Sequence, residues 1–279
     1  MAIRNVRSTP IAGPRDAGPP QHDSVQRRGL PLYAAGEIDV PFVVASRTEL
    51  IRSETYWEEH SHPTHELLWN QRGVSSARIG GRVWMLTPVV GLWIPAGVRH
   101  SGWTPAGTRH RAAQFAVDSV PAISDRPVTV ELTPLLQLLL DRLESDRLAP
   151  AARSRTEAVV LDVLAPARHR LSLQMPESPL LAPICAAVRD DPADATTLVA
   201  WAARLRVSPR TITRTFQSET GLGFSQWLAT ARMQHAVAML ARGDSLDEVA
   251  LCVGYHSASS FGAAFRRVTG TSPGRFLLH

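Results

Sequence analysis

The C-terminal hundred residues carry one helix pattern twice, and this repeat limits the possible folds more than any other feature of the sequence. Two segments resemble each other at a shift of 48 residues, which rises to 49 after a turn. The matching apolar pairs are Leu198 and Leu246, Ala202 and Ala250, Leu205 and Val253, and Phe216 and Phe265. A small residue at Ala202 and at Ala250 lets one helix cross closely over the next. The pattern therefore predicts two helix-turn-helix units.

The turns and the segment between the two units support this interpretation. Ser208-Pro209 provides an N-cap and a first-turn proline, and Gly254 permits the positive φ of a tight turn. Apolar residues recur at helical spacing from Phe224 to Ala241, which predicts one helix of about 27 Å. Such a helix can hold two reading helices about 34 Å, or one DNA turn, apart. A helical bundle for protein contacts has no reason to repeat the turn chemistry, so DNA binding is favoured over a structural interaction module.

Over about residues 180 to 278 the chain resembles the AraC/XylS family of transcription regulators. The resemblance depends on motifs at fixed spacings, which are Ser208-Pro209-Arg210-Thr211-Ile212-Thr213-Arg214-Thr215-Phe216, Glu219-Thr220-Gly221, Val249-Ala250, Gly254-Tyr255, Phe261, Phe265-Arg266-Arg267, Gly270 and Ser272-Pro273-Gly274-Arg275-Phe276. One departure is Arg206, at a turn position where the family often has Gly. Arginine fits this position without strain if the turn needs no positive φ.

The resemblance also implies which side chains meet DNA. The first reading helix would present Arg210, Thr213 and Arg214 to the major groove, where arginine can bind guanine through two hydrogen bonds. Alternatively, Arg210 or Arg214 only holds a phosphate. The full set of expected DNA contacts is Ser208, Arg210, Thr211, Thr213, Arg214, His256, Ser257, Ser259 and Ser260. The second reading helix offers short side chains, so we expect it to dock on phosphates rather than to discriminate bases.

The N-terminal part has the short apolar runs of a β-domain. From about Val40 to Val117, β-branched and aromatic runs alternate with turn residues, and Gly80-Gly81 between two runs predicts a hairpin. The residues that resemble the two cupin motifs are His60-Ser61-His62-Pro63-Thr64-His65-Glu66, Gly73, Gly91, Pro95-Ala96-Gly97 and His100. The final Asn of the second motif is replaced by Thr104.

The cupin resemblance implies a metal site inside the barrel, with His60, His62, Glu66 and His100 as ligands. In a strand, His60 and His62 face the same side, and we expect His65 to point outward. Three imidazoles and one carboxylate suit a divalent transition metal, namely Zn, Ni, Mn or Fe, without choosing among them. Alternatively, the same residues form internal hydrogen bonds or contact an organic effector.

Tryptophans are concentrated in the same region. Trp69, Trp84 and Trp93 are candidates for the walls of an effector pocket, because aromatic walls with a few polar groups are typical of small-ligand sites. Tryptophan in a small barrel belongs to the core by default. With Trp103 included, we expect at least two of the four to be core residues.

Proline and glycine divide the chain into four parts: a disordered basic arm (1–30), a cupin sensor domain (31–125), a helical dimerisation or linker segment (126–178) and a double helix-turn-helix domain (179–279). In the linker, Thr133-Pro134 begins a leucine-rich helix that runs to about Arg147, and a second helix runs from about Arg153 to Leu164. The leucine face either packs on the barrel or forms the contact of a homodimer. The predicted fold is a β-barrel, a helical linker and an all-α domain.

Composition agrees with a cytoplasmic protein. All 30 basic residues of the 279 are arginine, against 25 acidic residues, and this excess permits a nucleic-acid partner. Cys185 and Cys252 lie in apolar stretches, which fits reduced thiols better than a disulfide. We find no signal-peptide pattern and no window as apolar as a membrane span.

We therefore expect a transcription regulator that binds double-stranded DNA and senses a small molecule or a metal ion. A regulator that activates transcription would also contact RNA polymerase. The alternative is a metal-dependent cupin enzyme, of the dioxygenase or isomerase type, fused to a DNA-binding domain. No further acid/base constellation accompanies the histidines, so the expectation is a protein that is not an enzyme.

Overall fold

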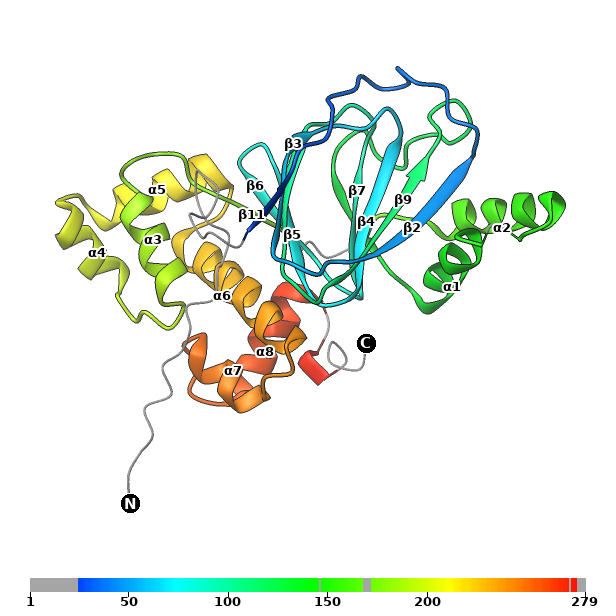
Figure 1. Cartoon of the computed structure of the whole chain (residues 1–279). Coiled ribbons are helices and arrows are strands. Elements are labelled where there is room, and N and C mark those ends of the chain that lie inside the picture. Colours follow the sequence, from blue (N-terminus) through cyan, green and yellow to red (C-terminus); the bar gives the residue numbers. More distant parts are fainter. Residues whose placement is uncertain (1–24, 146, 168–171, 271, 275–279) are drawn as a thin grey trace.

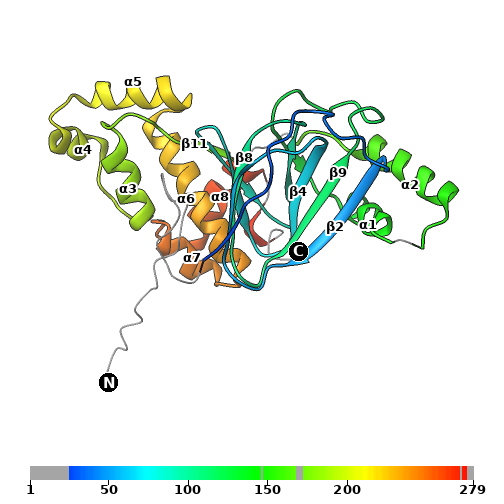
Figure 2. The ribbon, with the colours of Figure 1, turned by 45° about the horizontal axis from the view of Figure 1, so that its top comes forward.

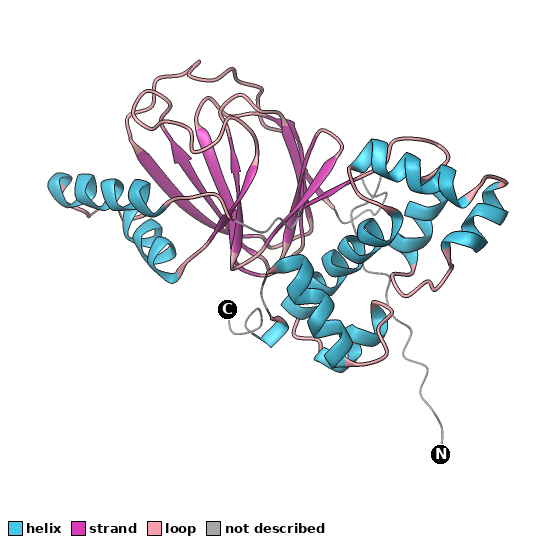
Figure 3. Cartoon of the chain, turned by 180° about the vertical axis from the view of Figure 1, so that it is seen from behind, coloured by secondary structure: helices cyan, strands magenta, loops and turns pink. Residues whose placement is uncertain are grey.

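The structure, a computed structural model, describes residues 25–145, 147–167, 172–270 and 272–274. A β-barrel lies between two groups of helices, with α1 and α2 on one side and the C-terminal helices on the other (Figure 1). Figure 3 shows the same division from behind. Most of the predicted basic arm, residues 1–24, and the motif residues Arg275 and Phe276 lie outside the described residues.

The barrel consists of two sheets. The six-stranded sheet follows the order β1 (Gln26–Arg28), β3 (Thr55–His60), β8 (His100–Thr104), β5 (Ser75–Ile79), β6 (Arg82–Leu86) and β11 (Ser172–Gln174). The five-stranded sheet follows the order β10 (Val128–Glu131), β7 (Val90–Ile94), β4 (His65–Arg72), β9 (Arg109–Phe115) and β2 (Val44–Leu50). Ile79 pairs with Arg82, so Gly80 and Gly81 form the predicted two-residue hairpin turn, with Gly80 at φ +56°.

The barrel extends beyond the limits that the sequence predicted for it. β10 pairs with β7 and β11 pairs with β6, so two strands come from the segment 126–178 that was predicted as helical. β1, which was assigned to the arm, pairs in parallel with β3. Each of these short strands is held by a partner that is distant in the sequence, and a local pattern does not reveal such pairing.

The helices α1 (Pro134–Leu143) and α2 (Pro150–Val163) form the linker pair, close to the predicted ranges. The hydroxyl of Thr133 accepts a hydrogen bond from the Leu136 amide and caps α1, as predicted. Leu136, Leu140 and Leu143 are buried against the barrel core, whereas Leu135 and Leu138 are 52% and 67% exposed. One face of α1 therefore packs against the barrel core, and the opposite face is exposed to solvent.

The C-terminal part is all-helical, as predicted. Its helices are α3 (Ala182–Asp190), α4 (Leu198–Leu205), α5 (Pro209–Thr220), α6 (Phe224–Ala241), α7 (Leu246–Cys252) and α8 (Ala258–Thr269). Each of α4, α5, α7 and α8 begins at a Ser or Thr whose hydroxyl accepts from a backbone amide of the first turn. The repeated turn chemistry in the sequence is therefore repeated N-capping.

The turn between α4 and α5 differs from the expectation. Arg206 has φ +56° and ψ +40°, and it is the only non-glycine residue with positive φ in the described part of the chain. The turn does need a left-handed residue, because the Val207 amide donates back to the Ala202 carbonyl. Arginine is strained in this conformation. Gly254, in contrast, has the predicted positive φ, at +80°.

The helical domain packs on the six-stranded sheet through α6 (Figure 1). Val74 and Met85 of the barrel share a buried cluster with Met233 and Val237 of α6. Nε1 of Trp227 donates to the Gln174 carbonyl of β11 at 3.0 Å. The two parts of the molecule therefore share a continuous apolar contact.

Candidate functional site

The predicted metal ligands line a cavity of about 440 Å³ within the barrel. His60 is the last residue of β3, His100 the first of β8, and Glu66 lies in β4. His62 lies in the loop between β3 and β4, which corrects the expectation that His60 and His62 share one strand. The four side chains nevertheless meet, because His60 pairs with His100 across the sheet and the loop folds back over them.

The ligand atoms converge. One nitrogen each of His60, His62 and His100 lie within 4.8 Å of one another. Oε1 of Glu66 lies 3.4 Å from Nε2 of His62, and Oε2 lies 3.3 Å from Nε2 of His100. Nε2 of His100 and Oε2 of Glu66 are buried and have no hydrogen-bond partner among the described residues.

Backbone carbonyls fix the orientation of two of the imidazoles. Nδ1 of His60 lies 2.7 Å from the Glu58 carbonyl oxygen, and Nδ1 of His100 lies 3.0 Å from that of Val98. Because a carbonyl only accepts, the proton of each neutral ring is on Nδ1, and Nε2 carries a lone pair. This arrangement is typical of metal-binding histidine, whose second nitrogen donates to an oxygen.

Burial and charge act in opposite directions at this centre. Burial lowers the pKa of His60 to about 4 and also lowers the pKa of His62. Burial would lower the pKa of His100 as well, but the adjacent Glu66 carboxylate outweighs it and raises that pKa. Burial would raise the pKa of Glu66, but the three histidines outweigh burial and lower it to about 2. The carboxylate is therefore ionised at neutral pH.

The donor set fits a transition metal ion. Bond lengths to zinc of about 2.0–2.1 Å let two nitrogen ligands lie up to about 4.2 Å apart, so small rotations of the rings would bring these atoms into bonding range. Gln114 donates from Nε2 to Oε1 of Glu66 at 2.6 Å and orients the carboxylate. Three imidazoles and one carboxylate can hold one ion here.

The tryptophans proposed for the effector pocket do not line this cavity, which corrects the expectation. Successive residues of β4 alternate between its faces, so Glu66 and Leu68 face the cavity while Trp69 faces the outer core beneath α1 and α2. Trp93 lies in the same outer core. Trp84 packs in another buried apolar cluster, with Leu68. All three are core residues.

His65 lies on the face of β4 away from the cavity, as expected, but it is buried rather than exposed to solvent. Its Nδ1 accepts a hydrogen bond from the Ala96 amide at 3.0 Å, and its ring lies 5.2 Å from that of Trp93. His65 is therefore part of the packing outside the cluster of His60, His62, Glu66 and His100.

The cavity is also lined by three aromatic residues that the sequence analysis missed, Phe42, Trp57 and His110. Nδ1 of His110 lies 3.0 Å from Oδ1 of Asn70, and burial lowers the pKa of His110 to about 4. Alternation along β9 places His110, Ala112 and Gln114 on the cavity face. That alternation is the signal in the sequence that could have identified them.

The first predicted DNA-contact helix is α5. Ser208, Arg210, Thr211, Thr213 and Arg214 are all exposed. Ile212 and Phe216, on the opposite face of α5, are fully buried. Figure 2 shows α5 at the outer edge of the helical domain, and its C-terminal part approaches β11 of the barrel. The predicted contact residues are exposed, so the barrel leaves their face of α5 accessible.

The second predicted DNA-contact segment is the N-terminus of α8. His256, Ser257, Ser259 and Ser260 are exposed. The Ser257 hydroxyl accepts from the Ser260 amide at 3.2 Å, which satisfies one amide of the first helical turn. The exposed side chains on this turn are shorter than those of α5.

Within the described ranges, the structure has no helix with the length and apolar character needed to cross a membrane. Comparison with known protein families gives two matches. Residues 48–163 match the family described as AraC-like ligand binding domain, and residues 201–278 match a helix-turn-helix domain family.

Two curated relatives are similar over most of this chain. The HTH-type transcriptional regulator NimR of Escherichia coli is 25% identical over 86% of this chain and 88% of its own length. The HTH-type transcriptional regulator RipA of Corynebacterium glutamicum is 33% identical over 75% of this chain, and the match covers 61% of RipA. Among solved structures, the match to ToxT from Vibrio cholerae covers 84% of this chain and 97% of ToxT, with 9% sequence identity and a TM-score of 0.36.

Both curated relatives are regulators of transcription and not enzymes, which disfavours the alternative of a metal-dependent cupin enzyme. The order of the two matched domains is a ligand-binding domain followed by a helix-turn-helix domain. The chain therefore belongs to the AraC family of transcriptional regulators.

Proposed function

We propose that this regulator binds a specific double-stranded DNA sequence through α5 and α8, and that one divalent transition metal ion and a small organic effector bind in the barrel cavity. The observation that carries the sensing part is the convergence of His60, His62 and His100 with the buried Glu66 carboxylate. A cavity of about 440 Å³ is much larger than an ion, so it leaves room for an organic ligand beside the metal.

The exposed face of α5 supports the DNA-binding part. Arg210 and Arg214 lie one helical turn apart and are both exposed, as bidentate contacts to guanine require. At α8, the serine hydroxyls and the remaining free amides suit phosphate oxygens, and the helix dipole favours an anion there. Because chromosomal DNA is the proposed partner, we place the protein in the cytoplasm.

A continuous packed route supports control of DNA binding by the cavity. His100 begins β8, which pairs with β5, and β5 pairs with β6. β6 in turn meets α6, where Nε2 of Gln234 donates to the Val83 carbonyl at 3.5 Å. Since α6 connects the two helix-turn-helix units, a shift of this sheet on ligand binding would change how the units are held.

The proposed homodimer uses the solvent face of the linker helices. Leu135, Leu138 and Val159 are exposed on α1 and α2, opposite the leucines that pack on the barrel. In a dimer, two copies would bind two half-sites and the linker pair would set their spacing. Activation through this arrangement would place RNA polymerase beside the DNA-bound dimer.

The test uses the full chain, purified without chelators. Elemental analysis should find one Zn, Ni, Mn or Fe ion per chain, and selection from a randomised DNA pool should return one preferred sequence. Dialysis against a chelator should change the affinity for that sequence. A chain without stoichiometric metal would overturn the metal site, and retention of random and selected DNA alike would overturn sequence-specific binding.

A further inference from the structure

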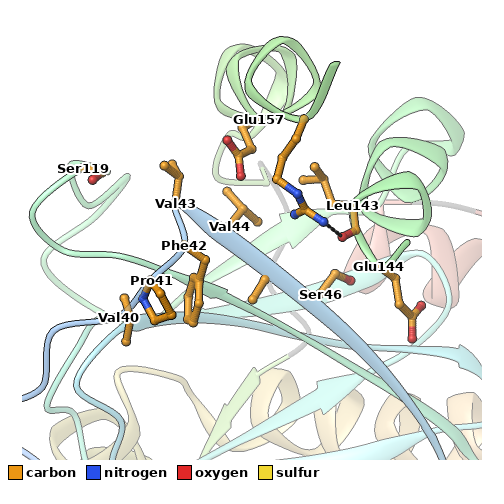
Figure 4. A pocket seen from close by; sticks show the side chains of 12 residues that line it. Val40, Pro41, Phe42, Val43, Val44, Ser46, Ser119, Leu143, Glu144 and Glu157 are labelled. Carbon is orange, nitrogen blue, oxygen red and sulfur yellow. Dashed lines mark hydrogen bonds between the residues drawn. The ribbon is translucent and has the colours of Figure 1, made fainter. Parts of the chain in front are cut away.

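A second cavity, of about 590 Å³, lies outside the barrel, between the start of β2 and the linker helices (Figure 4). Apolar residues form much of its wall, including Phe42, Val43 and Leu143. Arg153 and Glu157, one helical turn apart on α2, also line it. This cavity is distinct from the histidine centre, none of whose ligands line it.

The carboxylate of Glu157 is the unusual group in this cavity. Glu157 is only 6% exposed, and in the described part of the structure no hydrogen-bond donor or cation pairs with it. Arg153 makes no ion pair with it, and Nη2 of Arg153 donates instead to the carbonyls of Leu143 and Ser145, both at 3.1 Å. The carboxylate oxygens of Glu157 are not among the fully buried atoms, so they reach the solvent that fills the cavity.

Glu144, the other carboxylate in the wall, has both hydrogen-bond donors and a cation as partners. It accepts from the amide and the hydroxyl of Thr48, both at 2.8 Å, and Nη2 of Arg111 lies 3.3 Å away. Its role is to bind α1 to the barrel. Glu157 is therefore the carboxylate in this wall that has no partner among the described residues.

We propose that this cavity binds a small organic cation, with a primary ammonium group paired with Glu157 and an apolar body against Phe42, Val43 and Leu143. The ammonium has three donors, and the two oxygens of the Glu157 carboxylate are acceptors for them. The face of the Phe42 ring is a further favourable surface for a cation. One uncommitted carboxylate is too few ligands for a metal ion.

The two cavities share a wall. Val40, Phe42, Ala45 and Ser46 line both the cation cavity and the histidine cavity. A ligand that orders this segment on one side changes the surface offered on the other, so the two occupants are coupled. The coupling rests on the proposed effector site, but binding of the cation does not.

The test is calorimetric titration of the full chain with phenethylamine and with 3-phenylpropanoate, which have similar shapes and opposite charges. Phenethylamine should bind once per chain and 3-phenylpropanoate should not. Glu157→Gln should weaken phenethylamine binding by about tenfold or more, because an ionic hydrogen bond is lost. Asp162→Asn removes one exposed charge from the same helix and should leave the affinity unchanged.

Absence of saturable phenethylamine binding to the wild type, or equal binding to Glu157→Gln, overturns the proposal.

Thermal unfolding of the unliganded variant gives an independent readout. Glu157→Gln should unfold at about the same temperature as the wild type, because the Glu157 carboxylate makes no hydrogen bond or ion pair with the described residues. A lower temperature would reveal a structural partner for Glu157 and would also overturn the proposal. Metal content and DNA selection of this variant should match the wild type, which separates this test from that of the proposed function.

Discussion

Oε2 of Glu66 lies 3.3 Å from Nε2 of His100, and both atoms are buried without a hydrogen-bond partner in the described part of the chain. A metal ion between them would satisfy both atoms. His100→Ala should therefore reduce the metal retained after purification to a small fraction of one ion per chain, measured by elemental analysis. His65→Gln should retain the metal, because His65 lies on the other face of β4. Equal retention by both variants would place the metal elsewhere.

If α5 recognises bases, loss of its arginines should weaken binding to the preferred DNA more than binding to random DNA. Arg210→Ala or Arg214→Ala should cost about 1–3 kcal/mol of binding free energy on the preferred DNA site and less on random DNA, measured by titration at fixed salt. Arg155→Ala, at an exposed position of the linker helix α2, should bind both DNAs like the wild type. If each α5 variant loses the same affinity for both DNAs, the two arginines contact phosphates only.

The two helix-turn-helix units should contribute unequally to specificity. α8 presents Ala258, Ser259, Ser260, Gly262 and Ala263 where α5 presents two arginines. Short side chains cannot make the bidentate base contacts that discriminate by about 1–3 kcal/mol. Selection from a randomised DNA pool should return strong preferences in the half-site bound by α5 and weak ones a turn away. Strong preferences in both halves would mean that His256 or another residue enters the groove.

The left-handed conformation of Arg206 predicts a stabilising substitution. Arg206→Gly should raise the free energy of unfolding by about 0.5–1 kcal/mol, since relief of the left-handed strain exceeds the extra entropy of the unfolded chain. Arg204→Gly, two residues earlier within α4, should lower it by about 1 kcal/mol, because glycine is unfavourable inside a helix. Urea denaturation measures both. A destabilised Arg206→Gly protein would show that the arginine side chain has a structural role.

Burial of His235 in α6 predicts a dependence of stability on pH. Burial lowers the pKa of His235 from 6.5 to about 4 in the folded protein. Between these two values the unfolded chain holds a proton that the folded chain does not, so the free energy of unfolding falls as the pH falls from about 6.5 to about 4, by about 3 kcal/mol in total. Above and below this window the contribution is constant.

Urea denaturation from pH 4 to 8 should therefore show a steeper loss of stability for the wild type than for His235→Leu. The comparison isolates His235 from the other histidines, which are the same in both proteins. Parallel curves for the two proteins would show that His235 is protonated equally in the folded and unfolded states.

The sequence alone predicted the helices of the helix-turn-helix domain and the cluster of histidines and glutamate in the barrel. Its signals were local: the helix-capping hydroxyl of Ser208, the apolar spacing from Phe224 to Ala241, and the closely spaced His60, His62 and Glu66. Local backbone preference and side-chain periodicity are fixed by neighbours in the chain, so they can be inferred from a single sequence.

Only the tertiary structure decided the edges of the barrel, the residues of its cavity and the second cavity. Strands β1, β10 and β11 exist because distant segments pair with them, and Trp69 and Trp93 lie outside the cavity because of the face of the strand on which each falls. Glu157 and the start of β2 line one cavity only because α2 packs against the barrel core. These outcomes depend on which segments meet in space, and pairing between distant residues leaves no local signal in the sequence.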